Sequence, residues 1–331
     1  MLIPQAVIYN IKQTIYFLMQ LNGIVSWKLR ALKLAGDVPV LSLHRVGVSG
    51  QGGYAPLDAG IFQELLIWLE ERFFIVSIGD LEAQSKQEKP KLILSFDDGY
   101  KDFIEITAPI LDKRRIRVIQ NIIPACVESG RPPMNVELQD FIASAPAALL
   151  RETMLPGLPS GADPDRRSDS CLRVSAAIKA MPIAEQKRTF SELEGAIAQF
   201  DGFRPTSMMT LDEIREIAVI HEIGAHSFEH ASMATETDDY LREDLQKCMR
   251  YFELNLGFTP QIYAFANGSV RPLQYKIALQ AGYRHVLLVG EDYTRANAWV
   301  HPRFTLHAQS LAEAQARALG WFRWKNYTKH F

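Results

Sequence analysis

The chain has few cysteines, and this scarcity excludes two kinds of site. Of its 331 residues only three are cysteine, namely Cys126, Cys171 and Cys248. Their spacings are wide and follow no pattern, so they predict neither a disulfide framework nor a zinc site built from thiolates. We interpret them as three reduced thiols buried in the protein interior.

A large excess of charge of one sign is also lacking. The chain has 36 Lys and Arg against 38 Asp and Glu, which gives a formal net charge of -2. Tight nucleic-acid binders carry a basic stripe with interleaved aromatic residues, and the middle of the chain contains none. We therefore expect no nucleic-acid partner. The composition, 47% hydrophobic and 22% charged, is typical of a globular protein with a substantial core.

The N-terminal region lacks a long, unbroken apolar run. A membrane-spanning helix needs ~20 mostly apolar residues, and a secretory signal needs a basic start and a small-residue cleavage site. Residues 7–25 show neither pattern, because polar residues interrupt them. Their apolar residues instead fall at helical spacing, which predicts an amphipathic helix within residues 1–37. We expect this helix to pack on its own domain, with a weak peripheral membrane contact as the alternative. The expected location is cytoplasmic.

Short apolar runs alternate with helical patterns along residues 38–331. Each run has the length of a strand, and several are too uniformly apolar to be half-exposed. This alternation predicts an α/β fold in which seven or eight βα units close into a barrel. The predicted strands are Val38–His44, Phe73–Ile78, Lys91–Phe96, Val118–Ile123, Glu222–Ser227, Gln261–Ala266, His285–Val289 and Arg303–Leu306. The predicted helices between them are Ile61–Arg72, Asp102–Arg115, Leu211–Val219, Asp238–Leu256, Pro272–Ala281 and Leu311–Trp321.

One interval interrupts this alternation. No clear strand is predicted between about residues 125 and 205, so we interpret this block as a mainly helical and loop insertion on the barrel. Its stretch Pro156–Asp169 is rich in Pro, Gly, Asp and Ser, which favours a loop. Arg173–Phe200 is the strongest helix candidate in the block, with a break at Pro182.

The first chemically informative motif is the segment 91–99, KLILSFDDG. An apolar strand runs directly into two carboxylates, and the carboxyl ends of the strands surround the active site of an α/β barrel. Because adjacent residues point in different directions, one of Asp97 and Asp98 can bind a metal while the other faces the substrate. Gly99 permits the sharp turn that follows. Alone, this motif is also compatible with an Asp-rich turn that caps the next helix.

The second motif is the segment 222–230, EIGAHSFEH. His226 follows an apolar strand, and His230 lies four residues later. On a helical turn this spacing places two imidazoles on one face, about 5–6 Å apart, which suits two ligands of one metal ion.

Two histidines and one carboxylate leave open coordination positions for water and a substrate oxygen. Zinc fits this donor set, and so do cobalt, nickel and iron. Such an ion lowers the pKa of a bound water toward ~7 and polarises a carbonyl group, while the remaining carboxylate is a natural general base. The two motifs together therefore predict hydrolysis of an acyl group.

The segments SFDDG and HSFEH, in this order, resemble the first two motifs of the polysaccharide deacetylases, the NodB-homology or carbohydrate esterase family 4 group. The resemblance spans about residues 38–306 and implies a deformed (β/α)7 barrel with a divalent metal. By position, it implies that Asp97 is the catalytic base and that Asp98, His226 and His230 are the metal ligands. The third motif, which helps to hold the oxyanion, corresponds to Phe265–Gly268 but lacks the usual Tyr-Pro pair.

The general acid has two candidates under this resemblance. Many relatives take a histidine from a late Leu-x-His motif, which matches His307, whereas a subgroup uses an early histidine, which matches His44. We favour His44 because it closes a clean apolar strand. Arg303 is the candidate for the arginine that hydrogen-bonds the base aspartate and keeps its pKa low.

These observations predict a metal-dependent hydrolase that removes N-acetyl groups from an amino-sugar-containing glycan or glycan precursor. The alternatives are an O-acetyl esterase on the same fold and a catalytically inactive carbohydrate-binding protein. Two further expectations concern single segments: the start of the helix at residues 238–244 is solvated, and Trp299 is a candidate for stacking on a sugar ring.

Overall fold

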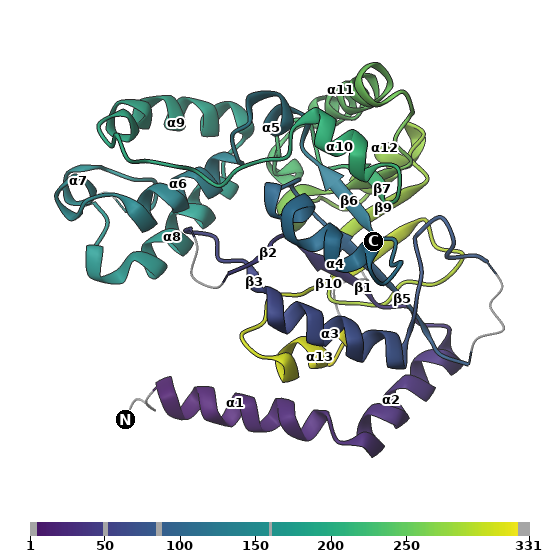
Figure 1. The fold of residues 1–331 in the computed structure, drawn as a ribbon. Helices are drawn as coiled ribbons and strands as arrows, with labels where there is room; N and C mark the ends of the chain where they lie inside the picture. Colours follow the sequence, from purple (N-terminus) through teal and green to yellow (C-terminus); the bar gives the residue numbers. More distant parts are fainter. Residues whose placement is uncertain (1–4, 49–51, 84–87, 159–160, 324–331) are drawn as a thin grey trace.

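A ring of seven parallel strands forms the centre of the molecule (Figure 1). The computed structural model describes residues 5–48, 52–83, 88–158 and 161–323. The ring contains, in spatial order, β1 (Val40–Leu43), β10 (Val300–Thr305), β9 (His285–Val289), β8 (Ile262–Ala264), β7 (Glu222–Ala225), β6 (Ile119–Ile122) and β5 (Lys91–Phe96). The α/β prediction of a (β/α)7 barrel is therefore confirmed.

Strand β1 closes the ring because it pairs with both β5 and β10. Leu41 lies opposite Leu94 on one side and Phe304 on the other. The short strand β4 (Phe74–Ile75) pairs with the first two residues of β5 and is not part of the ring. All eight predicted strands are present, and β5 and β9 have the predicted bounds. A further parallel pair, β2 (Val46–Gly47) and β3 (Leu57–Asp58), was not predicted, because two-residue strands leave no periodicity to detect.

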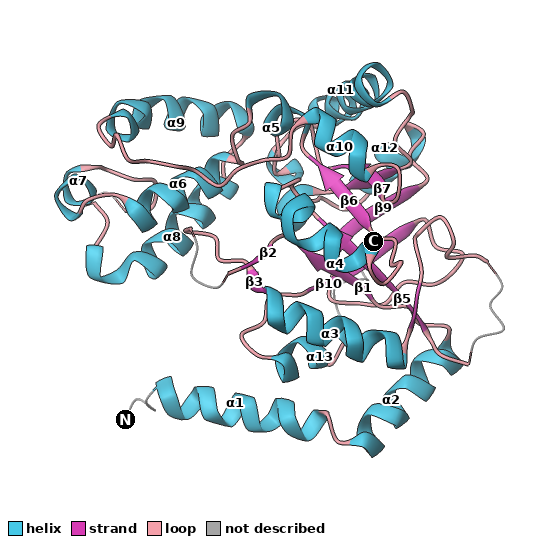
Figure 2. Cartoon of the chain, in the orientation of Figure 1, coloured by secondary structure: helices cyan, strands magenta, loops and turns pink. Residues whose placement is uncertain are grey.

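Helices surround the ring and bury their apolar faces against it (Figure 2). Helix α3 shows why: Phe62, Leu65, Leu66 and Leu69 recur at helical spacing and are buried, and the Asp58 side chain caps the first turn. The helices of the barrel are α3 (Ala59–Arg72), the π-helical turn η1 (Phe103–Thr107), α4 (Ala108–Asp112), α10 (Leu211–Ile217), α11 (Asp238–Leu256), α12 (Gln274–Gln280) and α13 (Leu311–Ala318), with short 3₁₀ turns η3 (Met233–Thr235) and η4 (Ala266–Gly268).

Two helices precede the barrel, α1 (Gln5–Met19) and α2 (Asn22–Ala35), and both lie along its lower edge in Figure 1. Helix α1 contacts α13 through polar groups. The Ser310 hydroxyl donates to Gln13 Oε1 at 2.7 Å, and Gln20 Nε2 donates to the carbonyl of Ala312 at 3.4 Å. Among the described residues, no helix is long and apolar enough to cross a membrane.

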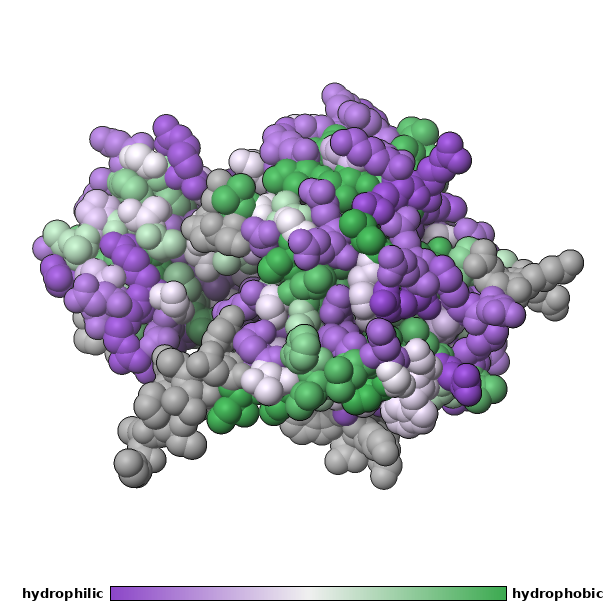
Figure 3. Space-filling view, turned by 60° about the horizontal axis from the view of Figure 1, so that its bottom comes forward, coloured by the Kyte–Doolittle hydropathy of each residue, from purple (hydrophilic) through white to green (hydrophobic). Residues whose placement is uncertain are grey.

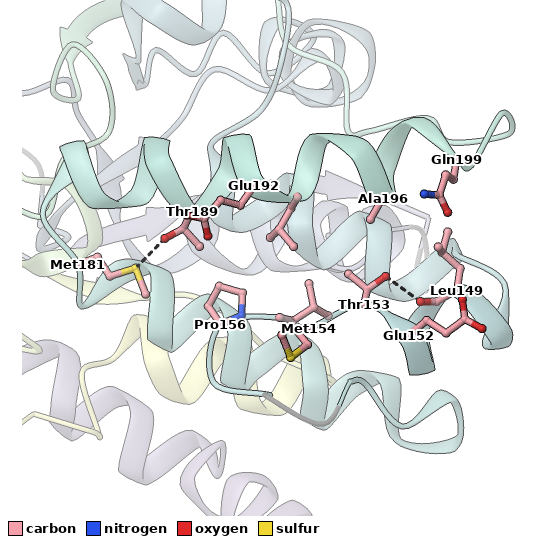
Figure 4. Close-up of a pocket in the computed structure, with 12 residues that line it drawn as sticks. Leu149, Glu152, Thr153, Met154, Pro156, Met181, Thr189, Glu192, Ala196 and Gln199 are labelled. Carbon is pink, nitrogen blue, oxygen red and sulfur yellow. Dashed lines mark hydrogen bonds between the residues drawn. The ribbon is translucent and has the colours of Figure 1, made fainter.

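The insertion that follows β6, up to about residue 205, contains five α-helices in its described part. They are α5 (Pro124–Ser129), α6 (Met134–Ser144), α7 (Ala147–Glu152), α8 (Arg167–Lys179) and α9 (Ile183–Ala198), with the 3₁₀ turn η2 (Pro164–Arg166). Helices α6 to α9 share an apolar core separate from that of the barrel, which includes Phe141, Val174 and Phe190. An open pocket of about 690 Å³, shown in Figure 4, lies between α7, the loop that follows it and α9, and Met154, Pro156 and Met181 help to line it.

The predicted helix Arg173–Phe200 is two helices, which meet at Met181 and Pro182. Helix α8 begins at Arg167, so the predicted loop Pro156–Asp169 extends three residues too far. Helix α6 is fixed to the barrel by Asp140, whose carboxylate accepts hydrogen bonds from Gly53 N at 2.9 Å and Thr206 N at 2.8 Å. Any side chain on Gly53 would overlap the backbone of α6 at Gln139, so this close approach requires glycine.

Candidate active site

The turn that follows β5 holds the two aspartates in different orientations. Asp97 continues the strand, and its N–H donates to the Leu43 carbonyl at 2.9 Å. Asp98 and Gly99 then adopt left-handed backbone conformations, with φ of 76° and 87°. A non-glycine residue rarely adopts this conformation without tertiary support. This strained turn directs the two neighbouring carboxylates to different partners.

Asp97 is buried within a set of hydrogen-bond donors. Its Oδ1 accepts from Arg303 Nη1 at 2.8 Å and from Asn121 Nδ2 at 2.7 Å, and its Oδ2 accepts from the Ser42 hydroxyl at 3.3 Å. Arg303 is fully buried and also donates to Ser95 Oγ at 3.0 Å. Burial alone raises the pKa of Asp97, but the charges of Arg303 and His226 outweigh burial and hold that pKa below its ordinary value. Asp97 is therefore ionised and fixed in orientation.

His226 and His230 come together after β7, but not on a helix. The expectation of a helical turn was wrong: residues 226–230 are an irregular loop in which Ser227 and His230 both have φ of 61°. The two ring centroids are nevertheless 5.2 Å apart. The loop is compact because Ser227 Oγ accepts a hydrogen bond from Ala231 N at 3.0 Å, which ties its two ends together.

A buried carboxylate on α11 supports this loop. Asp244 accepts hydrogen bonds from Ser227 Oγ and Phe228 N, both at 2.9 Å, and from Tyr263 Oη at 2.8 Å. The prediction that the start of α11 is solvated through residue 244 was therefore wrong at Asp244, which is only 2% exposed. Burial raises the pKa of Asp244 to about 6, although all three donors favour the ionised form.

Asp98, His226 and His230 are arranged as a metal site would require. Oδ1 of Asp98 lies 3.3 Å from His226 Nε2 and 3.4 Å from His230 Nε2. Although buried, this oxygen has no hydrogen-bond partner among the described residues. Ligand atoms of all three side chains lie within 4.8 Å of one another. The mixed N/O donor set fits a divalent transition metal.

Hydrogen bonding to the other nitrogen of His226 strengthens this interpretation. Its Nδ1 lies 2.9 Å from the Ala264 carbonyl, an acceptor, so Nδ1 carries the proton in the neutral ring. Nε2 then has its lone pair directed toward Asp98. Metal-bound histidines usually donate their second N–H in this way, which fixes the ring and makes it a stronger ligand.

The two candidates for the general acid occupy different places. His44, directly after β1, lines the same cavity as Asp97, Asp98 and the two histidines. Burial lowers its pKa, and the charges of Asp98 and Asp97 partly oppose that effect. His307 is exposed and does not line this cavity.

The cavity over these residues has a volume of about 300 Å³. Its lining includes Asn267 and Gly268 of the predicted third motif, where both residues have positive φ. A side chain on Gly268 would meet Val289 at 2.8 Å, so the tight turn needs glycine. Trp299 is not near the cavity, because it precedes β10 and thus lies at the opposite end of the strand from Thr305. The suggestion that it stacks on a substrate sugar at this site was wrong.

The insertion supplies the part of the lining that the motifs did not predict. Six of its residues line the cavity, from α6 and α8: Asn135, Val136, Gln139, Leu172, Ser175 and Lys179. Tyr54, from the loop between β2 and β3, also lines it. No sequence signal assigned these residues, because their position depends on how the insertion packs over the barrel.

Asn121 was also missed, although the sequence carries a signal for it. Two polar residues, Gln120 and Asn121, interrupt an otherwise apolar strand, and both are buried. A buried polar side chain needs partners, and Asn121 finds one in Asp97. The neighbouring strand makes room for it with Gly224, where any side chain would overlap the Asn121 amide.

Comparisons with known proteins agree with this arrangement. The family model "Polysaccharide deacetylase" matches residues 183–286, a range that contains His226 and His230 but not Asp97 and Asp98. This match confirms the resemblance predicted from the two motifs. No curated protein matches the chain.

Several solved structures share the fold. The Streptococcus pyogenes deacetylase PplD, determined in complex with acetate, is 14% identical with a TM-score of 0.56, covering 86% of this chain and 98% of its own. IcaB from Ammonifex degensii is 17% identical with a TM-score of 0.55, and the match covers 86% of this chain and 97% of IcaB. A de-N-acetylase from Aggregatibacter actinomycetemcomitans is 16% identical with a TM-score of 0.51, and the match covers 80% of this chain and 93% of the de-N-acetylase. At these identities the likeness shows the barrel fold.

Proposed function

We propose that the protein is a metal-dependent N-deacetylase that acts on an amino-sugar-containing glycan or glycan precursor. One observation carries the proposal: a buried Asp98 oxygen without a hydrogen bond faces the Nε2 atoms of His226 and His230, beside the Asp97 carboxylate. These three ligands would hold the ion, which we propose is zinc, with cobalt, nickel or iron as substitutes. When bound, the ion would acidify a water molecule and polarise the acyl oxygen.

The protein side chains would complete the hydrolysis. Arg303 and Asn121 hold Oδ1 of Asp97, while Oδ2 lies 4.0 Å from His226 Nε2, on the side of the proposed ligands. We assign Asp97 as the base that takes a proton from the attacking water. As the bond from acyl carbon to nitrogen breaks, His44 donates a proton to the leaving amine, and acetate is the second product.

One similar protein supports the choice of an N-acetyl substrate, because it is described as a de-N-acetylase. A second similar protein binds acetate, which hydrolysis of either an N-acetyl or an O-acetyl group would release. Phe265–Gly268 keeps the glycine of the third motif at the cavity, so backbone N–H groups there are candidates for holding the oxyanion.

Release of acetate from N-acetylated sugars tests the proposal directly. The purified protein is stripped with a chelator, reloaded with Zn²⁺ or Co²⁺, and assayed for acetate. We expect activity only after reloading, and expect Asp98→Ala to lose both bound metal and activity. Asp239→Ala, at an exposed position of α11, is the matched control. A fully metallated protein that is inert toward a broad panel of N-acetyl sugars would refute the proposal.

Adding O-acetylated sugars to the same assay separates the rival functions. The same arrangement of groups could attack an ester, so an O-acetyl esterase would release acetate from the O-acetylated sugars and leave the N-acetyl groups in place. A catalytically inactive carbohydrate-binding protein would bind sugars without acetate release, and absence of bound metal would favour it. A structural metal site would bind the ion but would give Asp97 no role.

We also propose that α1 and α2 attach the protein to an anionic lipid surface. Gln13, Tyr16 and Gln20 face the barrel, whereas the opposite side of α1 exposes Ile11, Ile15 and Leu18. The apolar side of this helix therefore faces away from the protein, the reverse of a helix that packs on its own core. Within residues 11–35, where exposure is described, the exposed large apolar residues are Ile11, Ile15, Phe17, Leu18, Leu21, Ile24, Trp27 and Leu34.

The charge of these helices favours a negatively charged surface. Residues 5–35 contain Lys12, Lys28, Arg30 and Lys33 but no Asp or Glu. Figure 3 brings forward the lower edge of Figure 1, along which these helices lie, and hydrophobic residues gather along the lower part of this view. Apolar area and basic charge together are what interfacial helices use to bind anionic lipid.

Vesicle flotation tests this attachment. We expect the protein to float with vesicles of phosphatidylglycerol and phosphatidylcholine, less with phosphatidylcholine alone, and not after Ile15→Glu combined with Leu18→Glu. Failure of the wild type to float with anionic vesicles would contradict the proposal. A concentration-dependent dimer that the double variant abolishes would show that a second copy covers this face instead.

A further inference from the structure

An unpaired lysine lies in the cavity of the proposed active site. Lys179, the last residue of α8, is the only lysine or arginine in its described lining. It forms no hydrogen bond or ion pair with any described residue. Lys179 is half-buried. Removing an ammonium group from water without a partner costs free energy, so desolvation lowers the pKa of Lys179, and the charge of Asp98 partly opposes this effect.

The two carboxylates of the cavity do not satisfy this lysine. Asp97 is paired with Arg303, and Asp98 faces the two histidines. The charge of Lys179 nevertheless acts on His44 and His230, which places it in the same electrostatic environment as the proposed reaction.

The packing of the insertion holds Lys179 at this position. Val174 and Ile178 of α8 are buried in the core of the insertion, whereas Leu172, Ser175 and Lys179 line the cavity at helical spacing. Helix α6, which packs against α8, is in turn anchored to the barrel through Asp140. The orientation of α8 therefore presents the lysine to the cavity.

We propose that Lys179 binds an anionic group of the substrate, a carboxylate or phosphate carried by the acetylated sugar. This inference rests on the proposed function for the identity of the sugar but not for the anion site. The amide of Gln139 and the hydroxyl of Ser175 line the same wall and supply further hydrogen-bonding groups. A cavity of about 300 Å³ is at the small end of ligand sites, which suits one sugar ring with its anionic substituent.

The test compares sugars that differ in charge. Binding of N-acetylglucosamine, N-acetylglucosamine 1-phosphate and N-acetylmuramic acid is measured by calorimetry, with metal-loaded Asp97→Asn protein to prevent turnover. We expect at least one of the two anionic sugars to bind roughly tenfold to hundredfold tighter than the neutral sugar, as a charge-assisted contact would give. Lys179→Gln should remove this preference and Lys179→Arg should keep most of it.

Arg173→Gln is the matched control, since it removes one positive charge from an exposed position of the same helix. Thermal denaturation of each variant verifies that it is folded. Equal binding of neutral and anionic sugars by the parent protein would overturn the inference, and so would a preference that survives Lys179→Gln. Turnover is compared separately, in protein with Asp97 intact. If Lys179→Gln lowers turnover of the neutral sugar but not of the anionic sugars, the inference is also overturned, because the lysine would then serve the acetyl group.

The two proposals fail in different ways. If no sugar is deacetylated but anionic sugars bind through Lys179, the anion site stands and the deacetylase function falls. If neutral and anionic sugars are deacetylated equally well, and Lys179→Gln changes neither rate, the function stands and the anion site falls.

Discussion

Removing the Asp244 carboxylate should weaken metal binding, although Asp244 is not a proposed ligand. Asp244→Ala leaves three buried donors without an acceptor, namely Ser227 Oγ, Phe228 N and Tyr263 Oη. At about 1–3 kcal/mol for each such group, partly relieved by rearrangement, we expect a loss of about 3–5 kcal/mol in the free energy of unfolding. The loop that presents His226 and His230 would then lose the contacts that hold its two residues of positive φ.

Groups that orient metal ligands typically contribute a factor of roughly 10–100 to metal affinity. We therefore expect the dissociation constant for Zn²⁺ to rise by that factor in Asp244→Ala, as measured by competition with a chromophoric chelator. Asp244→Asn should lose less, since its amide oxygen still accepts from Ser227 and Phe228. Asp239→Ala, on the exposed side of the same helix, should match the wild type. Unchanged zinc affinity in a folded Asp244→Ala protein would refute the reasoning.

Three further predictions follow from the same geometry. Arg303→Met leaves the buried Asp97 carboxylate unpaired and should lower the free energy of unfolding by about 3–5 kcal/mol in denaturant titrations; a change below 1 kcal/mol would contradict the role of this pair. His44→Ala should lower kcat by about 100-fold or more, whereas the exposed His307→Ala should leave it nearly unchanged, and the reverse result would exchange the assignments. Burial raises the pKa of Asp244 to about 6 in the folded protein, above the ~3.9 of an unfolded chain, so the folded state holds a proton that the unfolded state has released. The contribution of this group to stability is therefore greatest below pH ~4 and declines as the pH rises through 6, a decline that Asp244→Asn should remove from the measured stability profile.

The barrel could be predicted from sequence because its signals are local. Apolar runs such as Lys91–Phe96 and His285–Val289 are buried on both faces in a parallel sheet, so they contain few polar residues to blur their bounds. The six predicted site residues follow or belong to these strands. Their convergence at one end of the ring follows from the parallel arrangement, in which all strands end on the same side.

The remaining parts of the site depend on contacts between distant segments. The prediction placed His226 and His230 close together correctly but gave them the wrong backbone conformation. Ser227 and His230 have positive φ, and the loop between them is held by hydrogen bonds from Ser227 and Phe228 to the distant Asp244, which the local sequence does not reveal. In the sequence, Asp244 is one acidic residue at the start of a polar helix, and nothing distinguishes it from its neighbours. The sequence does not predict that Lys179 lines the cavity either, because the packing of α8 within the insertion determines which of its side chains face the cavity.

The position of β1 has a consequence for the order in which the protein is made. The first strand of the ring pairs with β5 on one side, but its other partner is β10, the last strand of the chain. During synthesis, one edge of β1 therefore has no native partner until residues 300–305 leave the ribosome, and an unpaired edge invites aggregation. Arg303 arrives with the same strand, so a nascent chain lacks the cation that fixes Asp97. Closure of the barrel and completion of the proposed active site are thus a single late event in the biogenesis of the protein.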